Sequence, residues 1–405
     1  MGAKRIGLGR IEALLENLKR DINWGPQTTH SRASKDRNRY YLEEYFKQRP
    51  ALNAALNTAF ADSDATALAN TAIRAAEKAA NKDFELQGTR AVTSCAAFSD
   101  VAGGFIMTTT TADQDQCIIA PHLDINQTAW TGVKWASHAS TEWECSITTS
   151  AAIDNQKIWA GLKLSNTSVA ITDADSIWFI ACSDGTFGST ATQQFATSDN
   201  AAMAADGTNM LWHCIYSIGG AFYTTNLGLA VEASTNYHFK IVLDSDRKAS
   251  VFINGTQYGL VNDTGYGITN AGTANGTWGE TNVVIDGASG GSTSTSATTL
   301  TVKTTDVRGA FKAGDFVYKA DTSVPIGKVK SVDSATSITL ETLDATMAND
   351  VELFNYGQKA TSATQKSKAL TTDIDFKPYI GIENGDAAAA ELTVHFTAIS
   401  RALND

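Results

Sequence analysis

Most of this chain alternates apolar and polar residues with a period of two, the pattern of half-buried β-strands. The clearest case is residues 236–260, where the run YHFKIVLD is followed by the turn DSDRK and by a second alternating run, ASVFI. Asn254-Gly255 ends that run, and this dipeptide is a strong signal for a tight hairpin turn. The segment therefore predicts two strands, a hairpin turn and a further short strand.

The same alternation fills residues 89–286 and returns near the end of the chain, in KPYIGIEN (377–384) and ELTVHFTAIS (391–400). Gly, Asn, Asp and Ser cluster between the strand-like runs, at the spacing of a β-sandwich. We expect the two late runs to close the same sandwich, because pairing between distant strands is normal in a jelly roll.

A different pattern interrupts the sandwich between residues 287 and 361. The Gly/Ser/Thr-rich run GASGGSTSTSATT begins it, as a hinge would. Short strands then follow at Thr299–Lys303, Asp315–Tyr318, Ile326–Val332 and Ser337–Glu341. They predict a small β-barrel inserted at an exposed loop.

The first 88 residues have helical periodicity. Their most regular part is a heptad seam, too short to be a stable helix alone, made of Leu8, Ile11, Leu15, Leu18 and Ile22. Two interpretations stay open: an amphipathic helix packed on its own domain, or an anchor that joins copies of the chain or another protein. Further helices are expected at Arg37–Gln48, Ala51–Phe60 and Asp64–Asn81, with Pro50 at a helix start.

The predicted fold is therefore mainly β: an antiparallel jelly-roll sandwich with a helical N-terminal segment and a small inserted β-barrel. We expect a helical anchor or oligomerisation segment at 1–88, the jelly roll at 89–286 plus 362–405, and the insertion at 287–361.

Charge is distributed unevenly along the 405 residues. The first fifty hold eleven Lys/Arg against six Asp/Glu, a net charge of +5, so the remainder carries −16 of the total of −11. A basic segment on an acidic body suggests that this segment meets an acidic partner or a sister subunit. Nucleic-acid binding is disfavoured, although basic residues and tyrosines alternate around Arg37–Tyr45, because no recognition motif accompanies them.

The five scattered cysteines form no C-x-x-C pair and are expected to be buried free thiols. The opening Met-Gly-Ala-Lys-Arg precedes no apolar signal segment, and no run is long enough to cross a membrane. These features predict synthesis in a cytoplasm and no membrane insertion.

Candidate chemistry is sparse. Catalytic jelly rolls carry E-x-D-x-E on one strand, and the nearest run here, Glu142-Trp143-Glu144, lacks the central acid. The six histidines have no zinc spacing, and no nucleotide-binding or serine-hydrolase motif occurs, so we predict no catalytic residues and no cofactor. Two acidic turns, Asp173-Ala-Asp175 and Asp244-Ser-Asp246, are candidates for calcium, but aspartates are common in turns, and no metal site is predicted.

Tryptophan offers the candidate binding residues. Trp143, Trp159, Trp178 and Trp212 fall in strand-like runs and are expected in the core. Trp130, Trp135 and Trp278 fall in loop-like contexts and are the candidate glycan contacts, with partly buried loop positions as the alternative.

Several segments resemble known families. Residues 236–260 resemble the late hairpin of laminin-G-like and concanavalin-like jelly rolls. GGFIMTTTTADQDQCIIAPHLD (103–124), KIWAGLKLSNTSVAITDAD (157–175) and KPYIGIENGDAAAAELTVHFTAISRA (377–402) resemble bacteriophage structural proteins widespread in marine phages. KRIGLGRIEALLENLKRDI (4–22) resembles their N-terminal leader, and the insertion resembles a module that they carry. The resemblance implies a virion component with a shared anchor and a variable β region.

The expected function is a non-enzymatic virion structural protein, a capsid decoration or head fibre that binds other virion proteins through its N-terminal helices and forms a homo-oligomer, with a trimer favoured. The alternatives are a tail fibre or receptor-binding protein that recognises host surface glycans, and an enzymatic depolymerase.

Overall fold

The computed structural model describes residues 39–46, 50–52, 81–88, 96–98, 104–111, 114–121, 129–164, 170, 173–183, 195, 203–204, 210–245, 247–260, 280–286, 298–303, 306–319, 322, 324–342, 347–355, 370–385 and 389–403.

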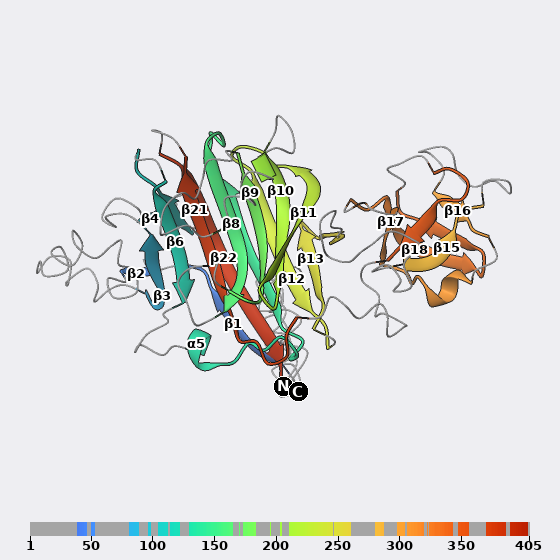
Figure 1. The fold of residues 1–405 in the computed structure, drawn as a ribbon, viewed down its shortest axis with the longest axis horizontal. Coiled ribbons are helices and arrows are strands. Elements are labelled where there is room, and N and C mark those ends of the chain that lie inside the picture. The colour runs from blue at the N-terminus through green and yellow to red at the C-terminus, as the bar shows by residue number, and fades with distance from the viewer. Residues whose placement is uncertain are drawn as a thin grey trace, which may run out of the picture.

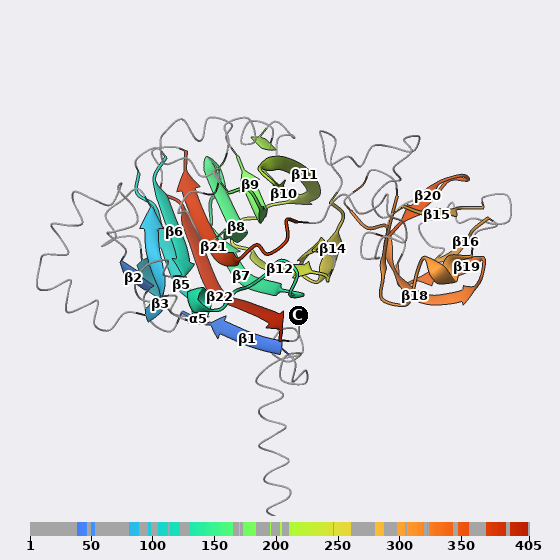
Figure 2. The ribbon, with the colours of Figure 1, turned by 60° about the horizontal axis from the view of Figure 1, so that its bottom comes forward.

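Two large sheets face each other and form a sandwich (Figures 1 and 2). The first sheet has the strand order β14 (Thr256–Tyr258), β13 (Ala249–Ile253), β12 (Asn236–Leu243), β7 (Glu142–Thr149), β22 (Glu391–Ala402), β5 (Phe105–Thr108) and β4 (Ala96–Phe98), with β1 (Arg39–Glu44) also on β22. The second has the order β11 (Ala221–Ala230), β10 (Leu211–Ile218), β9 (Ser176–Cys182), β8 (Gln156–Leu164), β21 (Phe376–Asn384), β6 (Gln116–Pro121), β3 (Asn81–Gly88) and β2 (Pro50–Leu52). Its strands are antiparallel except for β2, which runs parallel to β3.

The hairpin predicted from residues 236–260 is confirmed. β12 pairs with β13, and β13 pairs with β14. Alternate residues of β12 are buried, because Tyr237, Phe239 and Ile241 face the second sheet. Asn254 and Gly255 have φ of 50° and 80°, the left-handed conformation that this two-residue turn requires.

The core between the two sheets is aromatic. Phe179 stacks on Phe239 with ring centroids 4.6 Å apart, and Trp212 meets Phe239 edge-on at 4.8 Å. Trp143 is fully buried nearby, and its indole nitrogen donates to Thr397 Oγ1 at 2.9 Å. These large rings, drawn from both sheets, supply much of the buried apolar area that holds the sandwich closed.

The two late strands belong to the sandwich, as expected, and each lies inside one of its two sheets. β21 lies between β8 and β6, while β22 lies between β7 on one edge and β5 and β1 on the other. A mainly antiparallel, jelly-roll-like sandwich is therefore confirmed by the strand pairings.

The expected helix at Arg37–Gln48 is wrong. Residues Arg39–Glu44 form β1, paired in register with residues 397–402 of β22. Tyr40 and Leu42 pack against the sandwich core, while Tyr41 and Glu43 alternate onto the outer side. The free edge of β22 supplies the backbone partners, and tyrosine suits a half-buried strand.

The helix start at Pro50 is also wrong, because Pro50–Leu52 form strand β2. β3, at 81–88, pairs with β6 and buries Phe84 and Leu86 in the same core. The described strands that precede residue 88 thus belong to the sandwich sheets. The other helices expected in 1–88, including the seam Leu8, Ile11, Leu15, Leu18 and Ile22, lie almost entirely outside the described residues.

A third sheet has the order β15 (Glu280–Val284), β20 (Glu352–Phe354), β17 (Phe316–Lys319), β18 (Gly327–Ser334), β19 (Ser337–Leu340) and β16 (Thr299–Thr301). It surrounds its own apolar core, which includes Leu300, Val317 and Ile338. The four strands predicted from sequence in this unit appear within two residues of their expected starts. The unit begins earlier than expected, because β15 pairs with β20 and not with a sandwich strand.

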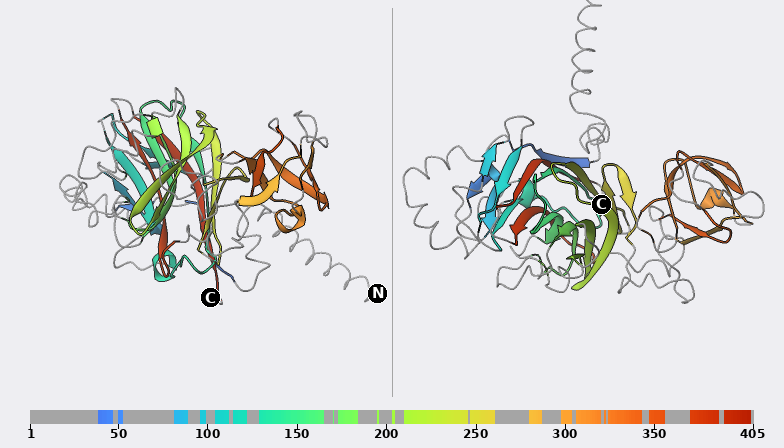
Figure 3. Two further views of the ribbon diagram at one scale, coloured as in Figure 1. Left: turned by 45° about the vertical axis from the view of Figure 1, so that its right-hand side comes forward. Right: turned by 90° about the horizontal axis from the view of Figure 1, so that it is seen from above.

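The third sheet lies beside the β13–β14 edge of the sandwich (Figures 1 and 3). The Tyr318 hydroxyl donates to the backbone carbonyl of Gln257 at 2.5 Å. Tyr318 and Phe354 are buried together with sandwich core residues. This contact holds the inserted unit against the end of the first sheet.

Candidate functional site

The outer face of the second sheet is the first candidate site. Along β8, Ile158, Ala160 and Leu162 point into the sandwich core, so Lys157, Trp159 and Lys163 point away from it. The same alternation places one set of β9 and β21 side chains on this outer face. Its polar residues are nonetheless buried, namely Glu85, Gln87, Gln116, Lys157, Lys163, Ser176, His213, Ser217, Lys377 and Glu383.

The centre of this face is a flat aromatic floor. A Cβ on Gly161 would lie 3.0 Å from Cε3 of Trp178, and a Cβ on Gly381 would lie 2.2 Å from Cζ2 of Trp159. Both indoles therefore lie across glycines of the neighbouring strand. Phe195 stands edge-on over both tryptophans, with centroid distances of 5.7 Å to Trp159 and 5.4 Å to Trp178. Phe195 is itself buried, and its ring covers the two indoles, which are fully buried as well.

Two buried ion pairs lie beside the floor. Lys157 Nζ is 2.9 Å from Glu383 Oε2, and Lys163 Nζ is 3.2 Å from Asp173 Oδ2. Gln116 also donates to Glu383 at 3.1 Å. Burial lowers the pKa of Lys163 from its ordinary value, and the nearby Asp173 carboxylate opposes that shift. Every charge in these pairs is thus matched and removed from water.

The outer face of the second sheet is poorly suited to acid–base catalysis on a polymer. Burial, with the nearby carboxylates of Asp173 and Glu85, raises the pKa of Tyr379 well above its ordinary value, so the phenol stays protonated. Within the described part of the chain, no group of three His, Cys, Asp or Glu residues is placed to hold a metal ion. Among the described residues, the Trp159 and Trp178 indole nitrogens have no hydrogen-bond partner, and both rings lie against Phe195.

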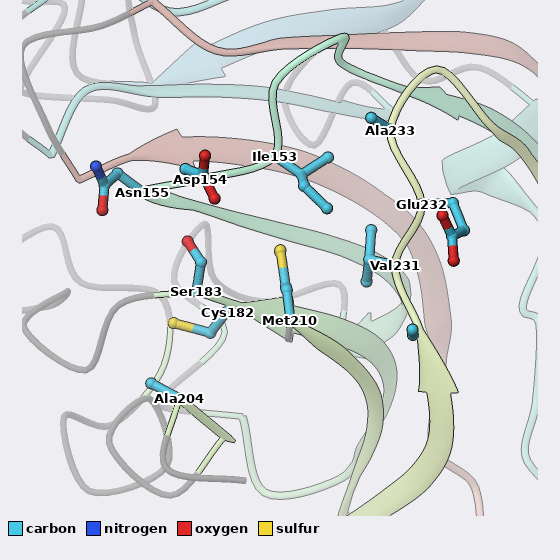
Figure 4. A pocket seen from close by; sticks show the side chains of 11 residues that line it. Ile153, Asp154, Asn155, Cys182, Ser183, Ala204, Met210, Val231, Glu232 and Ala233 are labelled. Carbon is cyan, nitrogen blue, oxygen red and sulfur yellow. The ribbon is translucent and has the colours of Figure 1, made fainter. Parts of the chain in front are cut away.

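The second candidate site is a cavity of about 440 Å³ at one end of the second sheet (Figure 4). Five segments meet there: the turn between β7 and β8, the end of β9, residues 203–204, the start of β10 and the turn between β11 and β12. Its lining consists of Ile153, Asp154, Asn155, Cys182, Ser183, Ala204, Met210, Ala230, Val231, Glu232 and Ala233.

The structure buries two of the three predicted glycan contacts. Trp135 is fully buried, and its indole nitrogen donates to the carbonyl of Trp130 at 2.9 Å. Trp130, on the short helix α5 (Ala129–Gly132), is 2% exposed and packs edge-on against Phe84 at 4.8 Å. Neither can stack on a sugar, so this prediction is wrong for both; Trp278 lies outside the described residues.

Glu142 and Glu144 do project from one face of β7, the outer face of the first sheet. Lys240 binds both, at 2.9 Å and 2.8 Å, and Arg39 Nη2 lies 3.4 Å from Glu142. His238 Nε2 is 3.3 Å from Glu144. The two carboxylates thus form a cross-strand ion-pair cluster.

The two aspartates of the 173–175 turn accept hydrogen bonds from backbone amides. Asp173 accepts from the Leu164 amide at 3.1 Å, and Asp175 accepts from the Thr371 amide at 2.9 Å. Asp244 accepts from the Lys248 amide at 2.9 Å and closes the turn between β12 and β13. Only the Asp244 contact is the local hydrogen bond for which turns use aspartate, because Leu164 and Thr371 lie 9 and 196 residues away from the aspartates that they bind.

Sequence reasoning missed the buried pair of Lys157 and Glu383, the cover formed by Phe195, and the cavity. One signal was present: KIWAGLKL carries a lysine near each end of an otherwise apolar strand, where an exposed face would usually hold more polar residues. The cavity gave no signal in the sequence, because its walls come from five separate segments.

No protein-family model matches this chain, and no curated protein matches it. Solved structures show a loose likeness. The alginate lyase A1-II′ of polysaccharide lyase family 7 is 8% identical with a TM-score of 0.32, and the match covers 77% of this chain and 85% of the lyase. A glycoside hydrolase family 16 endo-glucanase from Bacteroides ovatus is 7% identical with a TM-score of 0.34, covering 79% and 95%. The carbohydrate recognition domain of Emp46p is 6% identical with a TM-score of 0.32, covering 78% and 88%. At these TM-scores, the likeness carries no inference about activity.

Proposed function

We propose that this chain is a non-enzymatic structural protein of a phage particle, a capsid decoration or head fibre displayed on the surface after synthesis in the host cytoplasm. The observation that supports a non-enzymatic role is the outer face of the second sheet. Its lysines are paired with carboxylates in buried contacts, and Phe195 covers its aromatic floor. A polymer cannot reach such a face without displacing this cover.

The arrangement of the phage-like segments supports the virion part of the proposal. Segments 103–124, 157–175 and 377–402 lie far apart in sequence. Their strands are neighbours in space: β8, β21 and β6 in the second sheet, and β22 and β5 in the first. The resemblance therefore falls on one contiguous block at the centre of the sandwich, as a shared building unit would.

The test of this role is the number of copies in a purified particle. Quantitative mass spectrometry of particles, relative to the major capsid protein, should give tens to hundreds of copies for a decoration. About a dozen copies would instead indicate a tail component, and absence from the particle would contradict the proposal.

The N-terminal seam carries the proposed assembly. Leu8, Ile11, Leu15, Leu18 and Ile22 would bind other virion proteins or sister copies, with a trimer favoured. Leu15→Asp with Leu18→Asp places charges in that seam and should give a folded monomer that no longer joins the particle. Light scattering and particle incorporation measure this. An oligomer that still incorporates would show that the seam is only internal packing.

Glycan recognition is the second candidate function, as in a receptor-binding protein. The observation that favours it is the cavity at the end of the second sheet, which has a size typical of small-ligand sites. A glycan array with the full chain tests it, and binding to no array glycan would contradict it.

A further inference from the structure

The end cavity combines an apolar wall with a polar rim. Ile153, Met210 and Val231 line one part of it, while Asp154 and Asn155 contribute a carboxylate and an amide group. Figure 4 shows Met210 and Ser183 pointing toward the 153–155 turn, while the Glu232 side chain points to the opposite side of the β11–β12 turn from Val231. A pyranose ring has the matching character, because its C–H faces are apolar and its hydroxyl groups donate well to carboxylates.

The cavity walls are fixed before any ligand arrives. The Gly385 amide donates to the Asn155 carbonyl at 2.7 Å, and the Val231 amide donates to the Met210 carbonyl at 2.9 Å. The Gln156 amide donates to Ser183 Oγ at 2.7 Å, and the Glu232 amide donates to the Tyr237 hydroxyl at 2.7 Å. Both turns are therefore tied to neighbouring strands, so binding would cost little ordering of the backbone.

The charge of the lining narrows the ligand class. None of the described lining residues is basic, and Asp154 contributes an exposed carboxylate. A uronic acid or a sulfated sugar would bring a like charge close to Asp154, with no cation among the described lining residues to offset the repulsion.

We propose that this cavity binds one non-acidic pyranose unit of a glycan and discriminates against uronic and sulfated sugars. The inference deepens the glycan-recognition proposal and rests on it. It does not depend on the chain being a virion component.

The experiment uses the full chain and ligand-observed nuclear magnetic resonance. The probes are the methyl glycosides of glucose, galactose, mannose and N-acetylglucosamine, with methyl glucuronide and methyl glucosaminide as charged counterparts. Ala233→Trp fills the cavity mouth from an exposed turn and should abolish binding of the neutral glycoside. Ala204→Trp fills it from the opposite wall and should do the same.

The matched control is Ala151→Trp, an exposed alanine near the β7–β8 turn that is not part of the lining. It should keep full binding, and equal urea midpoints for the tryptophan variants establish that they fold. Asp154→Asn should strengthen glucuronide binding by about tenfold relative to glucoside, because the like-charge repulsion is gone.

Four outcomes decide the inference. Loss of neutral binding in both filling variants, with retention in Ala151→Trp, supports it. Glycan-array binding that survives both filling variants overturns the cavity assignment and leaves glycan recognition standing. Preference for the glucuronide over the neutral probes or the glucosaminide overturns the discrimination against acidic sugars. Binding to no probe and to no array glycan overturns glycan recognition together with this inference.

Discussion

The two outer faces of the sandwich carry the same chemistry in opposite settings. On the first sheet, Lys240 pairs with Glu142 across neighbouring strands, with side-chain exposures of 14% and 16%. On the second sheet, Lys157 pairs with Glu383 across neighbouring strands, with exposures of 0% and 1%. The geometry of the two pairs is alike, and both Nζ–O distances are 2.9 Å.

Burial changes how much the loss of one partner costs in the free energy of unfolding. Near water, the attraction is small and the loss of one partner is largely compensated by solvent. Away from water, the pair offsets a large desolvation cost, so the loss of one partner leaves a charge that nothing compensates. Substitution of a charged residue should therefore be costly on the outer face of the second sheet and much less costly on that of the first. This contrast gives an ordered set of expected effects.

The largest effect is expected from Glu383→Gln. The change keeps the shape of the side chain but removes the carboxylate that balances the buried Lys157 ammonium. We expect a loss of about 3–5 kcal/mol in the free energy of unfolding, measured by urea denaturation. Adding Lys157→Met should recover most of it, because the unbalanced charge is then absent. A single variant as stable as the native protein would show that water reaches this pair.

The next effect is expected from Phe195→Ala. The ring is 2% exposed and contacts Trp159 and Trp178 edge-on. Its removal should cost about 3 kcal/mol through lost burial and an unfilled cavity, with a shift in tryptophan fluorescence. Phe396→Ala is the matched control on the other outer face, where the ring is half-buried beside Tyr45 and His238. A smaller loss of stability from Phe195→Ala than from Phe396→Ala would contradict the interpretation that Phe195 covers the outer face of the second sheet.

Sequence alone could predict the pattern of strands but not this contrast. The alternation in YHFKIVLD and ASVFI sufficed for the β12–β13 hairpin, because local alternation and turn residues determine it. Lys157 and Glu142 looked alike in sequence, since each is a charged residue at the outward position of a strand. Their difference arises from residues far away in sequence, such as Phe195, that cover one face only.

The same physical reason explains two errors. The expected helix around Tyr40 and Leu42 became β1 because the free edge of β22 supplies backbone partners that local propensity cannot reveal. Trp130 and Trp135 looked like loop residues with free rings, yet the strands that bury them, β1 and β3, had been assigned to a helical segment. Once those strands are misplaced, the burial of the loop beneath them is misjudged as well.

Alkaline pH should distinguish the buried Tyr379 on the second sheet from the more exposed Tyr45 beside the first, by a further, smaller effect. Burial raises the pKa of Tyr379 on the second sheet well above its ordinary value, while burial and Glu43 raise the pKa of Tyr45 to about 12. A tyrosine whose folded pKa exceeds the unfolded value of about 10 contributes stability that is present below that pH and is lost as the pH rises toward the folded pKa.

Stability should therefore fall between about pH 9 and about pH 11, by roughly 1 kcal/mol for each pH unit per buried tyrosine. Tyr379→Phe should make this fall less steep, measured as urea midpoints at both pH values. Tyr45→Phe should change it much less, because the Tyr45 side chain is 41% exposed and solvent screens its surroundings. An equal fall of stability with pH in Tyr379→Phe and Tyr45→Phe would contradict the expected difference between these two tyrosines.

The smallest effect is expected from Glu142→Gln on the outer face of the first sheet. Glu142 lies 2.9 Å from Lys240 and 3.4 Å from Arg39, but Lys240 keeps its second partner, Glu144, at 2.8 Å. The loss should stay below about 1 kcal/mol and shrink further at about 1 M salt, since water and salt still reach this partly buried cluster and Lys240 keeps its second partner. The loss from Glu383→Gln should persist in the same salt, because screening does not reach a buried pair. A Glu142→Gln loss as large and as salt-independent as that of Glu383→Gln would mean that the outer face of the first sheet is covered too, in solution, by a partner or a sister copy.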